Sequence, residues 1–133
     1  MGLGLGVLGL SSTVGRLGAV EDIANTANFA NDVKLVSHFN THGAEFGAQS
    51  ADEYLQAGRD IMQYGQKIGY LYKGETRTGY VQFMENTTKG DAKFGFVGTN
   101  QEGAITTIHT QSGNSFWKLL NGNPLNKTIY PKP

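Results

Sequence analysis

The hydrophobic residues recur at helical intervals in the first half of the chain and in short β-rich runs in the second half. Within residues 20–47, Leu35, Phe39 and Phe46 fall within about 40° of each other on a helical wheel, which predicts an amphipathic helix. Gly47 is suited to end it, because glycine readily adopts the left-handed conformation found at helix C-termini. We therefore expect this segment to bury one apolar face.

A second helix is predicted over residues 51–64. Ser50 precedes it and Glu53 follows three residues later, which is the spacing of a capping box. In this motif the two side chains accept hydrogen bonds from backbone N–H groups that the first turn leaves unpaired. The buried side of this helix is expected to carry Tyr54, Leu55, Ala57, Ile61 and Met62.

From residue 67 onward the chain forms short runs rich in aromatic and β-branched residues, separated by segments of turn composition. These runs predict antiparallel strands at residues 68–74, 78–86, 92–99 and 103–110. The alternation in the second run is irregular, so its register stays open.

Two later segments and the order of the elements complete the fold prediction. Residues 115–122 fit either a helical turn or a half-buried strand. Residues 126–133 could add a last edge strand before the prolines end it. Helices followed by antiparallel strands predict an α+β fold, with N-terminal helices packed on a twisted antiparallel sheet of four to five strands.

The length of 133 residues suits one folded domain, and we place it at residues 31–133. Residues 1–30 read as a glycine-rich leader and entry segment. Its apolar run is too short and too rich in glycine to span a bilayer, and it lacks the basic start of a signal peptide. We therefore expect no membrane span in this chain and a flexible or weakly helical leader.

Charge is unevenly distributed, although the net charge of the whole chain is zero. Residues 1–65 hold three basic and seven acidic side chains, a net charge of −4, and residues 66–133 hold eight basic and four acidic ones, a net charge of +4. Such segregation allows a neutral protein to present a cationic face, although ordinary scatter would explain it too. The absence of cysteine excludes disulfides, cysteine-based zinc sites and a thiol nucleophile, which suits a reducing cytoplasm.

The first candidate chemistry lies on the predicted first helix. His38, His42 and Glu45 are spaced i, i+4 and i+7, so they would line one side of it. Imidazole titrates near neutral pH and is the usual general acid and base. Alternatively, His42 could be a core-edge residue bonded to a backbone carbonyl, Glu45 could be solvated, or the two histidines could bind a metal. The zinc protease pattern has Glu directly after the first His, where this chain has Phe39, so we expect no metal and no other cofactor.

A second candidate lies on the last predicted strand. Thr107 and His109 would share one face, while Thr106, Ile108 and Thr110 would point to the other. If the first face lies opposite the histidine helix, one imidazole can take the proton of a ribose 2′-OH and another can protonate the departing 5′-oxygen. Hydroxyl and lysine donors can hold the phosphate as its charge grows. Strand propensity alone would also explain Thr107.

Further residues could contact RNA. Arg77, Lys89 and Lys93 lie in or beside predicted turns and could contact the phosphate backbone. Thr128 and Tyr130 share a face of the edge strand that the tail could form and could hold a phosphate, although packing explains them as well. Three tyrosines could stack on unpaired bases, although we expect burial in the sheet for at least two of them: Tyr70, Tyr72 and Tyr80.

Residues 38–47 read HFNTHGAEFG and are followed by the helix SADEYLQAGRDIM. Later come KFGFV at residues 93–97, a turn with Gly103, and Thr107 on a strand. Together these features resemble C-terminal toxin domains of bacterial polymorphic and contact-dependent growth inhibition systems, in the barnase, EndoU, colicin and RelE-like group of ribonucleases. The resemblance covers about residues 33–110.

The resemblance implies helices packed on a twisted antiparallel sheet and metal-independent cleavage of RNA, often tRNA, that leaves a 2′,3′-cyclic phosphate. It implies a cognate immunity protein, delivery by secretion or from the cell surface, and action in the cytoplasm of a target cell, with the leader as the joint to the delivery machinery. Roles carry over to His38, His42 and Glu45, and less directly to Thr107.

The chain departs from the family pattern in two places. His109 stands where an aromatic residue is more usual, which could strengthen the site or relocate it. Residues 111–133 extend beyond the pattern, so Trp117, Thr128 or Tyr130 could complete the site.

Two other functions stay open at this point. A metal-dependent DNase toxin could use the histidine pair, and a chelator would then abolish its activity. A non-catalytic binding or immunity module would not kill a host that lacks a protective partner, and the cationic second half argues against an immunity protein, since these are commonly acidic. For the ribonuclease, we expect His42→Ala and His109→Ala each to abolish toxicity and leave the fold intact.

Overall fold

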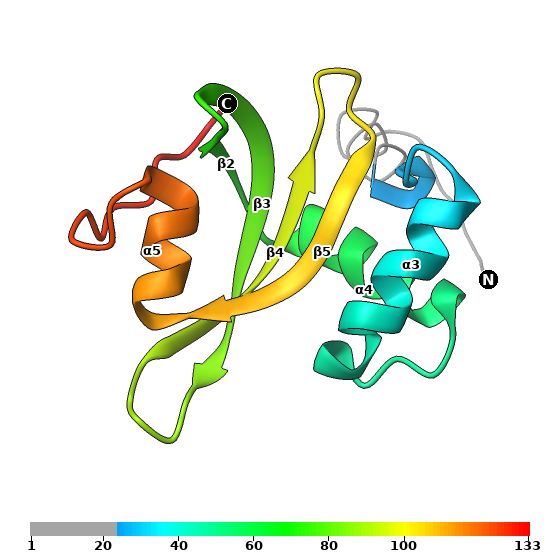
Figure 1. The fold of residues 1–133 in the computed structure, drawn as a ribbon, viewed down its shortest axis with the longest axis horizontal. Helices are drawn as coiled ribbons and strands as arrows, with labels where there is room; N and C mark the ends of the chain where they lie inside the picture. The colour runs from blue at the N-terminus through cyan, green and yellow to red at the C-terminus, as the bar shows by residue number, and fades with distance from the viewer. Residues whose placement is uncertain (1–23) are drawn as a thin grey trace, which may run out of the picture.

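The computed structural model describes residues 24–133, in which helices pack on both faces of one antiparallel sheet (Figure 1). The predicted α+β class is confirmed, and the sheet of the described residues has four strands, within the predicted four to five. The elements are α3 (Asp32–His42), the 3-10 helix η1 (Gly43–Phe46), α4 (Ala51–Tyr64), β2 (Gln66–Tyr72), β3 (Glu75–Asn86), β4 (Ala92–Thr99), β5 (Ile105–Ser112) and α5 (Gly113–Asn121).

The helices lie on both sides of the sheet in chain order, because α5 follows β5. This last helix resolves the alternative at residues 115–122 in favour of a helix. In Figure 1, α5 lies to the left of β3, α4 passes behind β4 and β5, and α3 runs beside β5. Among the described residues, no helix is long and apolar enough to cross a membrane.

Most of the leader predicted at residues 1–30 falls on residues 1–23 and lies outside the described residues. The segment from residue 24 onward is packed: Ala24 and Phe29 are buried in the same core cluster as α4. The Arg59 side chain holds this segment by donating from Nε to the carbonyl of Ala27 (3.0 Å) and from Nη2 to Asn28 Oδ1 (2.8 Å).

The two predicted helices form where expected, with one change. At the start of α4, the Glu53 amide donates to Ser50 Oγ (3.1 Å), as the capping box requires. Gly47 ends the first helical segment with a φ of 67°. The α-helix itself stops at His42, and a 3-10 turn carries Glu45, so this carboxylate follows the helix rather than extending it.

The sheet has the strand order β2-β3-β4-β5, and every neighbouring pair is antiparallel. Two register shifts explain features that local alternation does not predict. One lies between Phe83 and Glu85 and accounts for the irregular pattern of β3. The other, between Gly98 and Thr99, lies opposite the start of β5.

Each face of the sheet carries its own apolar cluster. The face covered by α4 has Tyr54 and Ile61 from that helix packed on Val97 and Ile108. The face covered by α5 has Phe116 and Leu120 packed on strand residues that include Ile68, Tyr70, Val81 and Phe96. His109 pairs with Phe96 across the sheet and has its ring beside it (centroids 5.3 Å apart), so His109 lies on the α5 face.

Candidate active site

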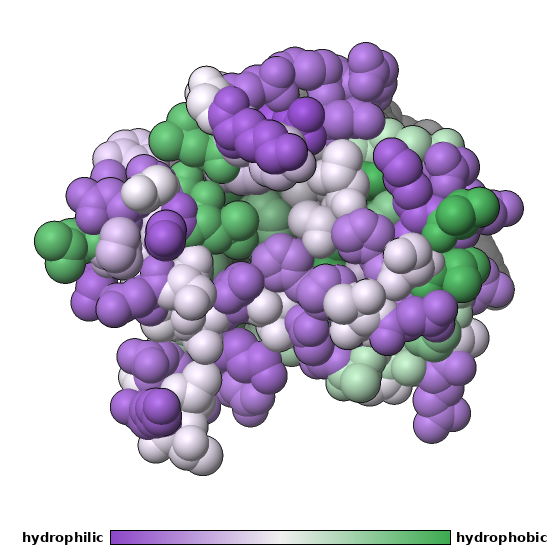
Figure 2. Space-filling view, viewed as in Figure 1, coloured by the Kyte–Doolittle hydropathy of each residue, from purple (hydrophilic) through white to green (hydrophobic). Residues whose placement is uncertain are grey.

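A cleft of about 740 Å³ lies over the α5 face of the sheet, between α3 on one side and Leu119 of α5 on the other. The space-filling view shows this face hollowed over the sheet, with hydrophobic residues visible inside the hollow (Figure 2). The cleft is lined by histidines from both of the predicted segments, His38 of α3 and His109 of β5.

The three histidines of the chain form one row. The His42 ring lies between the other two, with its centroid 6.1 Å from that of His38 and 5.4 Å from that of His109. His38 and His109 line the cleft. His42 is not part of the cleft lining, and 25% of its side chain is exposed. The structure therefore brings the helix and strand histidines together.

Glu45 fixes the orientation of His42. Its Oε2 accepts from His42 Nδ1 (2.7 Å), while its Oε1 accepts from both the amide (2.8 Å) and the hydroxyl (3.0 Å) of Thr110. Burial alone would raise the pKa of Glu45, but the hydrogen bonds from His42 and Thr110 outweigh it and hold this pKa below its ordinary value. An ionised carboxylate only accepts hydrogen bonds, so His42 Nδ1 carries a proton and Nε2 is its second functional nitrogen.

His109 has the properties of a proton acceptor. Burial lowers its pKa from the ordinary value of 6.5, and the neighbouring His42 adds to this, whereas the Thr110 carbonyl opposes it. That carbonyl lies 3.3 Å from His109 Nδ1 and can only accept, so Nδ1 is the donor. In the neutral ring the lone pair is then on Nε2.

The pKa of His38 is also lowered from the ordinary value of 6.5 by its surroundings. Burial lowers its pKa first, followed by the charges of His42 and Lys34. Its Nδ1 is buried and has no hydrogen-bond partner within residues 24–133. A buried polar atom without a partner costs free energy, which is tolerated most often where function rather than stability determines the side chain.

Thr107 and Arg77 line the same cleft as the histidines, as does Lys34 of α3. The prediction that Thr106 faces the opposite side is wrong. The irregularity at the start of β5 puts both Thr106 and Thr107 in the cleft wall, and Ile105 with Ile108 in the core under α4.

Tyr70 reaches the middle of the cleft because two glycines make room for it. A Cβ on Gly98 would lie 2.7 Å from the Tyr70 hydroxyl, and one on Gly79 would lie 3.0 Å from its ring. The Tyr70 pKa is raised by burial, which outweighs the effect of Thr106 and Arg77, so the hydroxyl keeps its proton. With only 3% of its surface exposed, Tyr70 is packed in the sheet and is not a stacking surface.

The other four predicted RNA contacts do not lie at the histidines. Lys89 is exposed in the turn between β3 and β4, and Lys93 Nζ lies 3.4 Å from Glu85 Oε2 on the same hairpin. The expected strand face of Thr128 and Tyr130 is wrong, because residues 127–133 form no strand beyond an isolated bridge at Pro131. This tail runs along β2, which is the edge of the sheet opposite β5.

Sequence reasoning missed several residues of the site, above all Thr110, Lys34 and Ser37. Thr110 faces away from the cleft, and only its position on the edge strand lets it reach Glu45. The helical spacing offered a signal for the other two, since Lys34 is four residues before His38 and Ser37 is three residues after Lys34.

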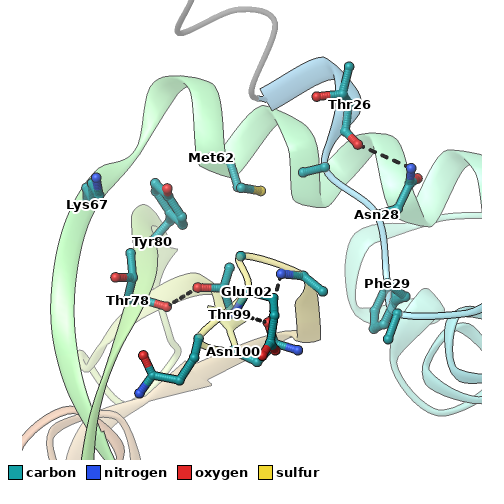
Figure 3. Close-up of a pocket in the computed structure, with 15 residues that line it drawn as sticks. Thr26, Asn28, Phe29, Met62, Lys67, Thr78, Tyr80, Thr99, Asn100 and Glu102 are labelled. Atoms are coloured by element: carbon teal, nitrogen blue, oxygen red, sulfur yellow. Dashed lines mark hydrogen bonds between the residues drawn. The ribbon is translucent and has the colours of Figure 1, made fainter.

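No three His, Asp or Glu side chains within residues 24–133 are placed as a set that could hold a metal ion. A second hollow, of about 620 Å³, lies between the segment before α3, Met62 of α4 and the turn between β4 and β5 (Figure 3). Lys67, Thr78 and Tyr80 form one side of it, and no histidine lines it. Of these two hollows, the first has imidazoles in its lining and the second has none.

Comparisons of the chain with models of protein families, with curated proteins and with solved structures found no match.

Proposed function

We propose that this chain is a metal-independent endoribonuclease of a bacterial toxin, and that it cleaves RNA by transesterification to a 2′,3′-cyclic phosphate. The observation that carries the proposal is that His38 of α3 and His109 of β5 line one cleft, with the His42 ring between theirs. The cleft also holds a hydroxyl and two cations that can contact a phosphate, from Thr107, Arg77 and Lys34.

In the proposed reaction, His109 Nε2 takes the proton of a ribose 2′-OH, and the 2′-oxygen attacks the adjacent phosphorus. The bond between phosphorus and the 5′-oxygen breaks, and the imidazolium of His38 gives its proton to that oxygen. Thr107 and Lys34, which line the cleft with the two histidines, stabilise the charge that grows on the phosphate oxygens. Glu45 acts through His42, which it orients between the two reacting rings.

Toxicity, tRNA as the preferred RNA, delivery into a target cell and neutralisation by an immunity protein follow from the resemblance of residues 33–110 to polymorphic toxin domains. Two observations support this part of the proposal. The chain has no cysteine, so its stability does not depend on an oxidising compartment. The segment HFNTHGAEFG, which carries the resemblance, supplies His38 of the cleft and the adjoining His42–Glu45 pair.

The test is cleavage of total RNA and tRNA by the purified chain in excess EDTA. We expect products ending in 2′,3′-cyclic phosphate, and a loss of about 10²- to 10⁴-fold in rate for His38→Ala. Asn40→Ala is the matched control, since this exposed residue lies on the same helix. Activity that disappears with EDTA would instead identify a metal-dependent nuclease, and a chain that is harmless in cells without an immunity protein would contradict the toxin assignment.

The pH dependence gives a separate test. The reaction needs one neutral and one protonated imidazole, and the pKa values of His38 and His109 both lie below 6.5 in the free protein. The profile of kcat/KM against pH should therefore be bell-shaped, with its maximum below pH 6.5. A maximum above pH 7.5 would contradict the assignment of these two residues.

A further inference from the structure

The cleft extends well beyond the imidazoles, from edge strand β5 towards the opposite edge strand β2. His109 on β5 and Tyr72 on β2 line the same hollow. With four strands side by side, these two edges are about 14 Å apart. The cleft is thus longer than the ribose and phosphate that react at the histidines, so its β2 end is available for another part of the substrate.

The β2 end holds an exposed aromatic ring with a guanidinium against it. Tyr72 is 40% exposed, in contrast to the packed Tyr70 two residues earlier. The guanidinium carbon of Arg77 lies 4.4 Å from the centre of the Tyr72 ring, and Arg77 Nε donates to Glu75 Oε1 (2.6 Å). The Lys73 ammonium adds a second cation 5.3 Å from the same ring. Glu75 therefore helps to hold Arg77 against the ring before any ligand arrives.

We infer that the Tyr72–Arg77 pair is a subsite for an unpaired nucleobase of the RNA. This inference rests on the ribonuclease function proposed above. Bases stack on aromatic rings and on guanidinium planes, and Arg77 with Lys73 adds positive charge for the adjoining phosphate. Because a base within a duplex is already paired and stacked, it cannot enter the cleft, so the substrate at the cut is single-stranded.

The subsite can be tested with a short single-stranded oligoribonucleotide by comparing kcat and KM of four proteins. Tyr72→Ala should raise KM roughly 5- to 150-fold and leave kcat nearly unchanged, because it removes the stacking surface and not the reacting groups. Tyr72→Phe keeps the ring and should stay within about twofold of the wild type. Leu71→Ala is the matched control, since Leu71 is the exposed neighbour on the same strand. An unchanged KM for Tyr72→Ala overturns the subsite and leaves the ribonuclease proposal standing.

A binding measurement can support the subsite even where the ribonuclease proposal fails. The probe is the same oligonucleotide with 2′-O-methyl groups, which removes the nucleophile and prevents cleavage, and binding is followed by fluorescence anisotropy. If the wild type cuts no RNA but Tyr72→Ala weakens this binding by the factor above, the subsite stands and the ribonuclease proposal fails. The subsite is overturned if Tyr72→Ala binds as tightly as the wild type, if the wild type does not bind the probe, or if a duplex of the same sequence is cut as fast as the single strand.

Discussion

Edge strands β5 and β2 both need partners for their outward backbone groups, and the chain supplies these partners differently. At β5, side chains provide two of them: the Tyr54 hydroxyl donates to the Ile108 carbonyl, and Glu45 accepts from the Thr110 amide. At β2 the backbone of the tail provides them, since the Lys132 amide donates to the Lys67 carbonyl (3.0 Å).

The backbone of Asn28 also meets the β5 edge, through the Ile105 amide, but the side-chain partners at this edge lie where the histidines are. A side chain that satisfies an edge strand also brings its helix and the neighbouring side chains to that strand, and Glu45 brings His42 in this way. The tail that covers β2 brings backbone hydrogen bonds and the packing of Ile129, but no histidine. The β5 edge therefore gains titratable groups, while the β2 edge gains protection from pairing with other chains.

The largest contrast is expected in activity, between one residue at each edge. His109→Ala at the β5 edge should lower kcat/KM for RNA cleavage by about 10²- to 10⁴-fold, because it removes the proposed proton acceptor. Tyr130→Ala in the tail along β2 should change it by no more than about twofold. Assays of both variants under one set of conditions check this, and a tail variant as inactive as His109→Ala would show that the tail takes part in the site.

The next largest effect should be on stability. Tyr54 is fully buried and its hydroxyl is the partner of the Ile108 carbonyl, so Tyr54→Phe leaves that carbonyl unpaired. We expect a loss of about 1–3 kcal/mol in the free energy of unfolding, measured by urea denaturation. No change in stability would mean that water satisfies the carbonyl equally well.

Glu45→Gln should lower the free energy of unfolding at neutral pH by about 1–2 kcal/mol. The loss is modest because the Glu45 side chain is one-third exposed and water screens its charge. The pKa of Glu45 is lowered in the folded state, so its contribution is fully present above the ordinary value of 4.5 and is lost as the pH falls through the folded pKa. Urea denaturation at pH 7 and at pH 3 should thus show a smaller difference between variant and wild type at pH 3. An equal difference at both values would contradict the assigned ionisation.

The smallest effect is expected from deleting residues 127–133. The deletion removes two backbone hydrogen bonds at the β2 edge and the packing of Ile129, at a cost of about 1 kcal/mol. The rate of RNA cleavage should not change, since this segment is remote from the histidines. Thermal unfolding and the cleavage assay measure the two quantities, and a deletion that unfolds the chain would give the tail a larger role than edge protection.

The parts of this fold that could be predicted from the sequence are those with local causes. The capping box at Ser50 and Glu53 gave the range of α4, and the helical spacing of His38 and His42 placed them on one side of α3. The parts that could not be predicted depend on contacts between distant segments. The irregular pairing at Thr99 moved Thr106 into the cleft, and the tail lay along β2 without forming a strand. Neither feature leaves a periodic pattern in the sequence.

The bonds between Glu45 and Thr110 join positions 65 residues apart in the chain. They exist only once both the helical layer and the last strand have folded, so an extended chain passing through a narrow pore carries none of the assembled chemistry. The proposed cleavage therefore requires the complete fold, and a chain in which β5 has not docked would be inactive.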